Sequence, residues 1–266
     1  MIPGHPPDAV SRMPTARFLI LETGRPVPPM RRYGNFDHWI RVAAGLPASV
    51  VTTLDAQADA LPAPAGSLGI LVTGSGAMVS HREAWSERAA AWLGEAARAG
   101  LPVFGICYGH QLLAHALGGD VGDNPVGRGM GTAEVERTDA AADDPLFAAA
   151  PERFAAQITH VQSVRRLPPD AVRLGTAGHD PHHAFRWGAH AWGVQFHPEF
   201  SVGHMRGYIR ARADVLRAED TDPKALAAAV RAAPQARRVL RRFVRHAYTV
   251  RGADGARDQA FQEQQA

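Results

Sequence analysis

The chain has 266 residues with a formal net charge of +3, and 45% of its residues are hydrophobic against 21% charged. This composition is typical of a soluble globular protein, the length suits one large α/β domain with appendages or two small domains, and the modest charge does not by itself indicate a nucleic-acid partner. A single cysteine excludes an intrachain disulfide, and no stretch approaches the roughly 18 consecutive apolar residues that span a membrane, so we expect a soluble, cytoplasmic protein.

The first half of the chain alternates short apolar runs with helical patterns. Residues 1–15 are rich in proline and lack the apolar region of a signal peptide, so we expect a disordered leader. Strands are predicted at 17–21, 49–54, 68–74 and 102–106, and helices at 36–45, 80–100 and 111–119. Ser80 is the expected N-cap of the 80–100 helix. Short apolar strands that alternate with helices predict a parallel sheet covered on both faces.

The pattern changes after Gly119, where strand-like pieces follow one another without a helix between them. These pieces lie at 128–137, 153–159, 171–178, 182–188 and 190–196. They predict antiparallel strands added to the sheet edge or forming a small side sheet. Helical patterns return at 202–218 and 225–248, the second interrupted at Pro234, and residues 251–266 are expected to form a flexible tail.

The only cysteine, Cys107, lies between two glycines in the sequence GICYG. Free cysteines are among the most buried residues and are usually inert, so a packing role is one interpretation. The other is a nucleophile, because a strand-to-helix junction offers backbone N–H groups and a helix dipole that stabilise a thiolate. Gly105 and Gly109 permit a sharp turn there, as in the Gly-x-Ser-x-Gly elbow of the α/β hydrolases. The pattern alone leaves both interpretations open, since a nucleophile needs a base.

The sequence WGVQFHPEF at 192–200 supplies the best candidate base among thirteen histidines. Residues two apart in extended backbone point to the same side, so the carboxylate of Glu199 can orient the imidazole of His197. The adjacent pair His182 and His183 is not predicted to bind a metal, because neighbouring strand residues face opposite ways. With a base and its orienting carboxylate available, the nucleophile interpretation of Cys107 becomes the stronger one.

The segments PVFGICYGHQLLAHALGG and WGVQFHPEF together resemble the class I glutamine amidotransferases, a family whose triad runs Cys, then His-x-Glu. The resemblance covers roughly residues 17–215 and is greatest to the amidotransferase domain of GMP synthases and its free-standing relatives. It implies a flavodoxin-like, mostly parallel central sheet with helices on both faces, plus added antiparallel strands and a C-terminal helical extension. The corresponding domain is expected at 16–218, followed by a basic helical extension at 219–250.

The resemblance also assigns roles to single residues. Cys107 is the expected nucleophile, His197 the base and acid, and Glu199 the orienting carboxylate. The oxyanion hole is expected from the backbone N–H of Tyr108 with that of Gly74 or Ser75, although Thr-Gly-Ser-Gly departs from the Ser-Gly-Gly-Pro of many members. The residues expected to contact the substrate glutamine are Gln111 and the loop residues His160, Val161 and Gln162, where Gln162 replaces a usual Asp.

The implied reaction is hydrolysis of the glutamine side-chain amide through a γ-glutamyl thioester, with no metal or other cofactor. The sequence has neither a Walker-type phosphate loop nor a Ser-Gly-Gly-x-Asp pyrophosphatase loop, so a synthetase that uses the ammonia is expected to be a separate partner. The same triad suits a hydrolase of other γ-glutamyl amides or peptides, and the loops at 24–29, 124–131 and 179–183 would decide the preference. A regulatory module with an inactive triad is a third alternative. Neither a membrane nor nucleic acid is expected as a partner.

Five arginines recur near the C-terminus with apolar residues at helical spacing between them. They are Arg237, Arg238, Arg241, Arg242 and Arg245. The simpler interpretation is an amphipathic helix that packs its apolar face on the core and exposes its arginines to water. The alternative is a docking surface for an acidic partner or nucleic acid.

Overall fold

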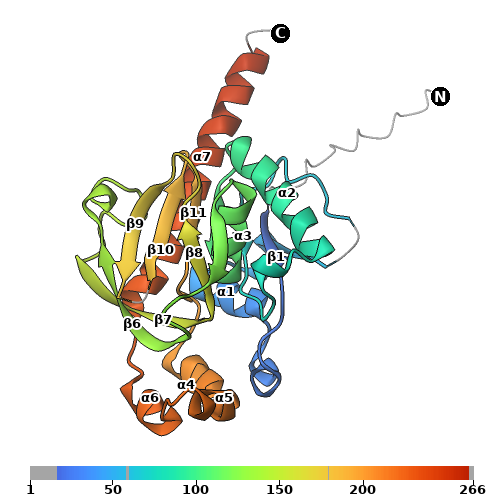
Figure 1. Cartoon of the computed structure of the whole chain (residues 1–266). Helices are drawn as coiled ribbons and strands as arrows, with labels where there is room; N and C mark the ends of the chain where they lie inside the picture. Colours follow the sequence, from blue (N-terminus) through green and yellow to red (C-terminus); the bar gives the residue numbers. More distant parts are fainter. Residues whose placement is uncertain (1–16, 58–59, 179, 264–266) are drawn as a thin grey trace, which may run out of the picture.

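A computed structural model of the chain describes residues 17–57, 60–178 and 180–263, with side chains described to residue 252 (Figure 1). The expected leader at 1–15 lies outside the described residues. Within the described residues, no helix is both long enough and apolar enough to cross a membrane.

Nine strands of the described chain form one mixed sheet in the order β2-β1-β3-β4-β11-β10-β9-β6-β7. The parallel half comprises β2 (Val51–Asp55), β1 (Phe18–Glu22), β3 (Gly69–Val72), β4 (Val103–Ile106) and β11 (Ala191–Val194). The antiparallel half adds β10 (Asp180–Trp187), β9 (Val172–Ala177), β6 (Gly129–Arg137) and β7 (Arg153–His160). β4 and β11 are therefore parallel neighbours at the centre, although they lie far apart in sequence.

Helices cover both faces of the parallel half, as the sequence predicts. α2 (Ala84–Arg98) and α3 (Tyr108–Ala116) lie on one face, and α1 (Phe36–Ala44) and α7 (Pro234–Glu263) on the other (Figure 1). Successive residues of β4 point to opposite faces, so Val103 joins the core under α2 and α3 while Phe104 joins the core under α1 and α7. Burial on both faces explains why the central parallel strands β3, β4 and β11 contain only apolar residues and glycine.

The sequence predicted antiparallel strands either at the edge of the main sheet or in a small side sheet, and the structure has both. Four extend the main sheet, and β5 (Asp120–Asp123) pairs with β8 (Gln162–Arg166) in a separate two-stranded sheet. Neither β5 nor β8 was predicted. Each contains a single strongly apolar residue, Val121 and Val164, so the local sequence carries little strand pattern.

The helical end of the chain forms a third core with the 3₁₀ helix η1 (Pro28–Tyr33). It is built by α4 (Val202–Ala211), α5 (Ala213–Ala218) and α6 (Pro223–Ala229), which lie together at the lower end of the molecule in Figure 1. The single helix expected at 202–218 is thus two helices that meet at Arg212.

Two helix ends differ from the sequence expectation. Ser80 is not the N-cap of α2, because it lies in the 3₁₀ helix η3 (Val79–His81) and its hydroxyl accepts a hydrogen bond from Gln162. Glu83 takes the N-cap position instead. At the other end, α7 continues to Glu263 through most of the expected flexible tail, whose alanine, glutamine and glutamate residues favour a helix. Pro234 starts α7, where its missing N–H costs nothing.

Candidate active site

Cys107 occupies the sharp junction between β4 and α3, at the carboxyl end of the central strands. Its backbone angles, φ 53° and ψ −102°, lie in a region that residues with a side chain rarely adopt. The strained residue is therefore the cysteine itself. Cys107 directly precedes Tyr108, the first residue of α3. As the first N–H of the helix, the backbone N–H of Tyr108 has no carbonyl partner within α3, and the helix fixes its direction.

The flanking glycines are needed for close packing. A Cβ on Gly105 would lie 2.3 Å from the carbonyl oxygen of Gly109, and a Cβ on Gly109 would lie 2.7 Å from the Cβ of Val72. Neither glycine has a positive φ. The pattern GICYG thus allows α3 to start directly against β3 and β4.

His197 and Glu199 follow β11, the parallel neighbour of β4, and both are buried. Nδ1 of His197 lies 2.7 Å from Oε1 of Glu199, as their same-side placement predicts. The Phe200 ring stacks on the imidazole with 4.3 Å between centroids, and the backbone N–H of His197 donates to the Gln157 carbonyl. These contacts fix both the direction and the tilt of the imidazole.

Gly74 brings the two halves of this site together. A Cβ at that position would lie 2.9 Å from Cε1 of His197 and 3.7 Å from the Cβ of Cys107, so the imidazole and the cysteine both pack against its backbone. Burial alone would lower the pKa of His197. The Glu199 carboxylate and Cys107 outweigh this effect and hold that pKa above its ordinary value.

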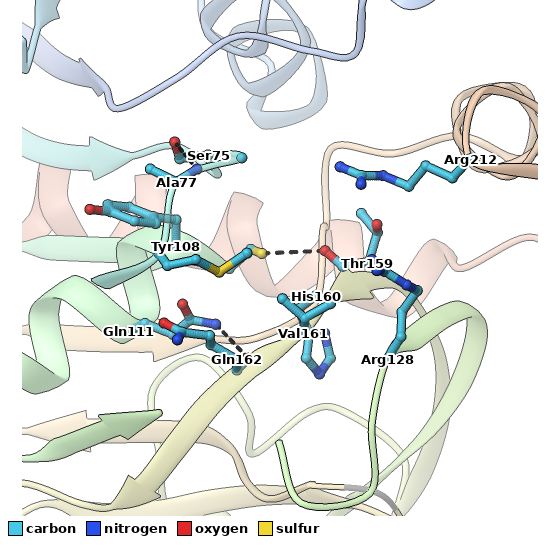
Figure 2. Close-up of a pocket in the computed structure, with 13 residues that line it drawn as sticks. Ser75, Ala77, Tyr108, Gln111, Arg128, Thr159, His160, Val161, Gln162 and Arg212 are labelled. Carbon is cyan, nitrogen blue, oxygen red and sulfur yellow. Dashed lines mark hydrogen bonds between the residues drawn. The ribbon is translucent and has the colours of Figure 1, made fainter. Parts of the chain in front are cut away.

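A cavity of about 120 Å³ opens beside Cys107, and all four residues expected to contact the substrate line it (Figure 2). Gln111 is held in place there, because its amide Nε2 donates to the Gln162 carbonyl at 2.7 Å and to Oε1 of Gln195 at 3.0 Å. Val161 contributes from the turn between β7 and β8. The side chains of the other two loop residues point elsewhere. Gln162 donates to Ser80 and Asp123, and the His160 ring points away from the sulfur, toward His183.

The loop after β3 contributes a residue that the sequence prediction omitted. Ser75 and Gly76 line the cavity with Cys107 and Tyr108, whereas Gly74 packs behind them against His197. The Ser75 hydroxyl donates to the Thr23 carbonyl and accepts from the Ala77 N–H, which shapes the loop. The second glycine of Thr-Gly-Ser-Gly was the available signal for Gly76.

Two arginines also reach this cavity without having been predicted. Arg128 forms a two-pronged ion pair with Glu219, with a shortest distance of 2.8 Å. Arg212 is half-buried at the break between α4 and α5, and its Nε atom is buried with no hydrogen-bond partner among the described residues. Figure 2 shows the Arg212 side chain above Thr159, on the same side of the cavity as Arg128. The loop at 124–131, expected to shape the pocket, supplies Arg128.

The remaining buried histidines do not form a metal site. Burial lowers the pKa of His110 to about 3, more than Asp180 raises it, so this imidazole is neutral in the core. Within the described part of the chain, no group of three or more His, Cys, Asp or Glu side chains is arranged to hold a metal ion. The prediction that 179–183 borders the pocket is not met by its described residues: Asp180 and Pro181 line a separate cavity, and residue 179 lies outside the described residues.

Comparison with known protein families identifies the family to which the chain belongs. The family model described as glutamine amidotransferase class-I matches residues 45–213, more than half of the chain. The chain belongs to the class I glutamine amidotransferase family. The matched region includes Cys107, His197 and Glu199, and it lies within the range over which the sequence resembles the family.

Among curated relatives, this amidotransferase chain is similar to two glutamine-hydrolyzing GMP synthases. It is 40% identical over 148 residues to that of Aeropyrum pernix and 41% identical over 131 residues to that of Thermomicrobium roseum. The aligned segments cover 56% and 49% of this chain but only 27% and 23% of the relatives, so the chain spans about a quarter of their length.

Solved structures share the fold. A glutamine amidotransferase from Thermotoga maritima superposes with a TM-score of 0.67 at 22% identity, over 86% of this chain and 96% of that one. A glutamine amidotransferase from Methylobacillus flagellatus superposes with a TM-score of 0.64 at 19% identity, over 87% and 94% of the two chains. The flavodoxin-like architecture with added antiparallel strands is thus that of class I amidotransferases.

Proposed function

We propose that the chain hydrolyses the side-chain amide of L-glutamine through a Cys107–His197–Glu199 triad. The observation that carries this proposal is the 2.7 Å contact between His197 and Glu199. The His197 imidazole packs on one side of Gly74, and Cys107, with its strained backbone, packs beside the same glycine and lines a cavity. A nucleophile, a base and an orienting carboxylate in this order are the parts that amide cleavage requires.

The reaction begins with attack of the Cys107 thiolate on the side-chain carbonyl carbon of glutamine. The N–H groups of Tyr108 and of Ser75 or Gly76 are the candidate donors to the developing oxyanion, and such donors contribute about 3 kcal/mol each in comparable sites. His197 then donates its proton to the nitrogen as the C–N bond breaks, and ammonia leaves. His197 next takes a proton from water, which hydrolyses the thioester to glutamate and restores the thiolate.

Gln111 and the backbone of Val161 and Gln162 are proposed to hold the amino-acid end of the substrate. Gln111 is already fixed by two hydrogen bonds, so it presents its carbonyl oxygen at low entropic cost. The ammonia acceptor is proposed to be a synthetase, because the curated relatives are glutamine-hydrolyzing GMP synthases.

The test is release of glutamate and ammonia from L-glutamine by the purified chain. We expect Cys107→Ala to lower kcat by at least about 10³-fold, since removal of a triad nucleophile leaves only binding and oxyanion stabilisation. Labelling of Cys107 by a glutamine-like diazoketone, read by mass spectrometry, gives an independent measure of thiolate reactivity. Absence of both turnover and labelling in the folded wild-type chain would favour the inactive-triad alternative and overturn the proposal.

A further inference from the structure

A second cavity reaches Cys107 from the side of His197. It has a volume of about 220 Å³ and is lined by Arg25, Arg31, Phe36, His197, Tyr208 and Arg212. The two cavities share the lining residues Ser75, Gly76, Cys107, Thr159 and Arg212, so the sulfur and the Arg212 side chain lie where the cavities meet. The loop at 24–29, expected from the sequence to shape substrate preference, forms part of its wall.

The position of this cavity relates it to the leaving group. His197 lines the second cavity and is absent from the lining of the first. Because the proton donor must reach the departing nitrogen, the amine half of the substrate leaves on the side of His197. The first cavity, which contains Gln111, then holds the glutamyl half.

The size of the second cavity exceeds the needs of ammonia. One water molecule occupies about 30 Å³ in the liquid, and ammonia is of similar size. A cavity of about 220 Å³ accepts an amine with several heavy atoms beyond its nitrogen. Phe36 and Tyr208 supply aromatic surface for its carbon atoms.

The charge of the lining points to the chemistry of that amine. Three guanidinium groups line the second cavity, and no described carboxylate side chain does. Arg212 makes no ion pair within the described chain, and its Nε atom is buried without a hydrogen-bond partner. Burial lowers its pKa and Arg128 lowers it further, which outweighs the opposing effects of Tyr208, Cys107 and Glu219. A half-buried cation of this kind is stabilised when an anion binds beside it.

We propose that the second cavity binds the amine half of γ-glutamyl amides whose amine carries a carboxylate, as in γ-glutamyl amino acids. Arg212 and Arg25 are the specificity-determining residues for that carboxylate. The inference rests on the proposed triad chemistry. Cys107 attacks the γ-carbonyl carbon, the C–N bond breaks, His197 protonates the nitrogen of the departing amino acid, and water hydrolyses the thioester to glutamate.

The test compares two substrates that differ in one charge, γ-L-glutamyl-glycine and γ-L-glutamyl-glycinamide, with L-glutamine assayed in parallel by the glutamate that all three release. We expect kcat/KM to be about tenfold higher for γ-L-glutamyl-glycine than for γ-L-glutamyl-glycinamide, as one charge-assisted hydrogen bond would give. Glycinamide is the less basic amine, so leaving-group ability alone would give the opposite order.

The arginine variants identify the source of the preference. Arg212→Gln and Arg25→Gln are each expected to lower the kcat/KM ratio of γ-L-glutamyl-glycine to γ-L-glutamyl-glycinamide by about fivefold. The matched control is Arg32→Gln, an exposed arginine of the same segment that stacks on Tyr33 and does not line the cavity, and it should leave the ratio unchanged.

The outcomes separate this inference from the proposed glutaminase activity. Glutamine turnover with no preference for γ-L-glutamyl-glycine over its amide would overturn the inference and leave the glutaminase proposal intact. Turnover of γ-L-glutamyl-glycine without turnover of glutamine would overturn the glutaminase proposal and support the inference. Absence of glutamate release from all three substrates would refute both the inference and the glutaminase proposal.

Discussion

The imidazole of His197 is set by three neighbours that act in different ways. Glu199 binds Nδ1, Phe200 stacks on the ring, and the backbone of Gly74 packs against Cε1. Only Glu199 among these carries charge. It therefore stabilises the imidazolium form, whereas burial among the other two groups opposes that form.

This division predicts a pH effect. In the proposed mechanism the free enzyme is active with His197 protonated, so kcat/KM should fall as pH rises through the raised pKa of that imidazole. Glu199→Gln removes the carboxylate that raises this pKa. We expect the alkaline limb of the kcat/KM profile for glutamine to move to lower pH, and kcat to fall by about 10²-fold or more. An unchanged alkaline limb in a folded Glu199→Gln protein would show that the limb belongs to another group.

Local motifs made the residue-scale chemistry accessible to sequence analysis. Cys107 lies within a five-residue pattern, and His197 and Glu199 are two positions apart, so local backbone geometry determines how each group is presented. Arg212 has no such signal. Its place in the cavity lining depends on the break between α4 and α5 and on the packing of α4 against η1, which no spacing within residues 202–218 indicates.

Secondary-structure elements were predictable where their side-chain pattern is decided locally. The apolar strands of the parallel half and the amphipathic α1 follow this rule. Ser80 shows the limit of local prediction, because its local sequence suits a helix cap. In the structure it lies within η3, and its hydroxyl accepts a hydrogen bond from the side chain of Gln162 on β8. Long-range hydrogen bonds of this kind override local preference.

The loop between β6 and β7 is tied to the sheet by one buried carboxylate, Asp144. It accepts hydrogen bonds from Nε1 of Trp192 on β11 and Nε of Arg186 on β10, and from the N–H groups of Leu146 and Phe147 in its own loop. One side chain therefore connects two central strands to a loop that is adjacent to neither in sequence.

Asp144→Ala is expected to lower the free energy of unfolding by about 3 to 5 kcal/mol, because it leaves the partly buried charge of Arg186 without its ion-pair partner and the buried Trp192 N–H without an acceptor. Urea denaturation followed by tryptophan fluorescence measures the change. The neighbouring exposed residue provides the control, and Asp143→Ala should stay within about 0.5 kcal/mol of wild type. Equal effects of the two variants would argue against the network.

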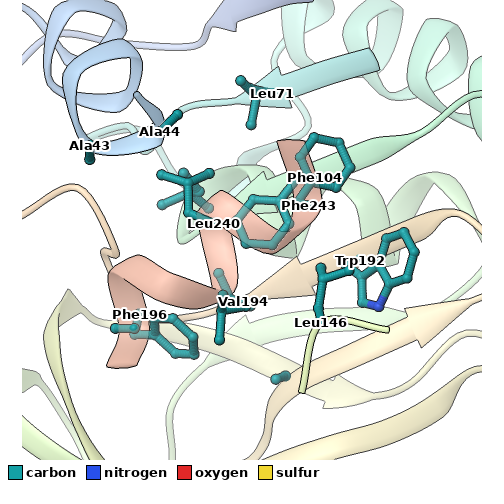
Figure 3. Close-up of a cluster of buried hydrophobic side chains, with 14 of the residues drawn as sticks. Ala43, Ala44, Leu71, Phe104, Leu146, Trp192, Val194, Phe196, Leu240 and Phe243 are labelled. Carbon is teal, nitrogen blue, oxygen red and sulfur yellow. The ribbon is translucent and has the colours of Figure 1, made fainter. Parts of the chain in front are cut away.

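At the scale of the whole molecule, α7 closes the face of the sheet opposite α2 and α3 (Figure 3). Val239, Leu240, Phe243 and Val244 are buried on its inner side, which confirms the prediction of an amphipathic helix packed on the core. Some of the arginines also bind the body of the protein: Arg241 donates to the Ala43 carbonyl, and Arg242 donates to the carbonyls of Leu146 and Ala149. α7 thus holds α1 and the β6–β7 loop together, although it lies beyond the 45–213 region matched to the family.

Phe243 is the residue on which this closure most depends. Its ring lies 5.1 Å from that of Phe104 on β4 and 6.2 Å from that of Trp192 on β11, the two strands that carry the proposed triad. Phe243→Ala would leave a cavity beneath both strands, and we expect the free energy of unfolding to fall by about 3 to 5 kcal/mol. The matched control is Arg238→Ala on the exposed side of the same helix, with a change within about 0.5 kcal/mol.

The same pair of variants separates stability from chemistry. Phe243 lines neither of the two cavities at Cys107. At a temperature where the Phe243→Ala protein stays folded, its kcat/KM for glutamine should therefore remain within about threefold of wild type, since the proposed triad lies in loops at the strand ends. A small loss of stability would show that α7 is not part of the core. A large loss of kcat/KM in the folded variant would show instead that α7 positions the triad through β4 and β11.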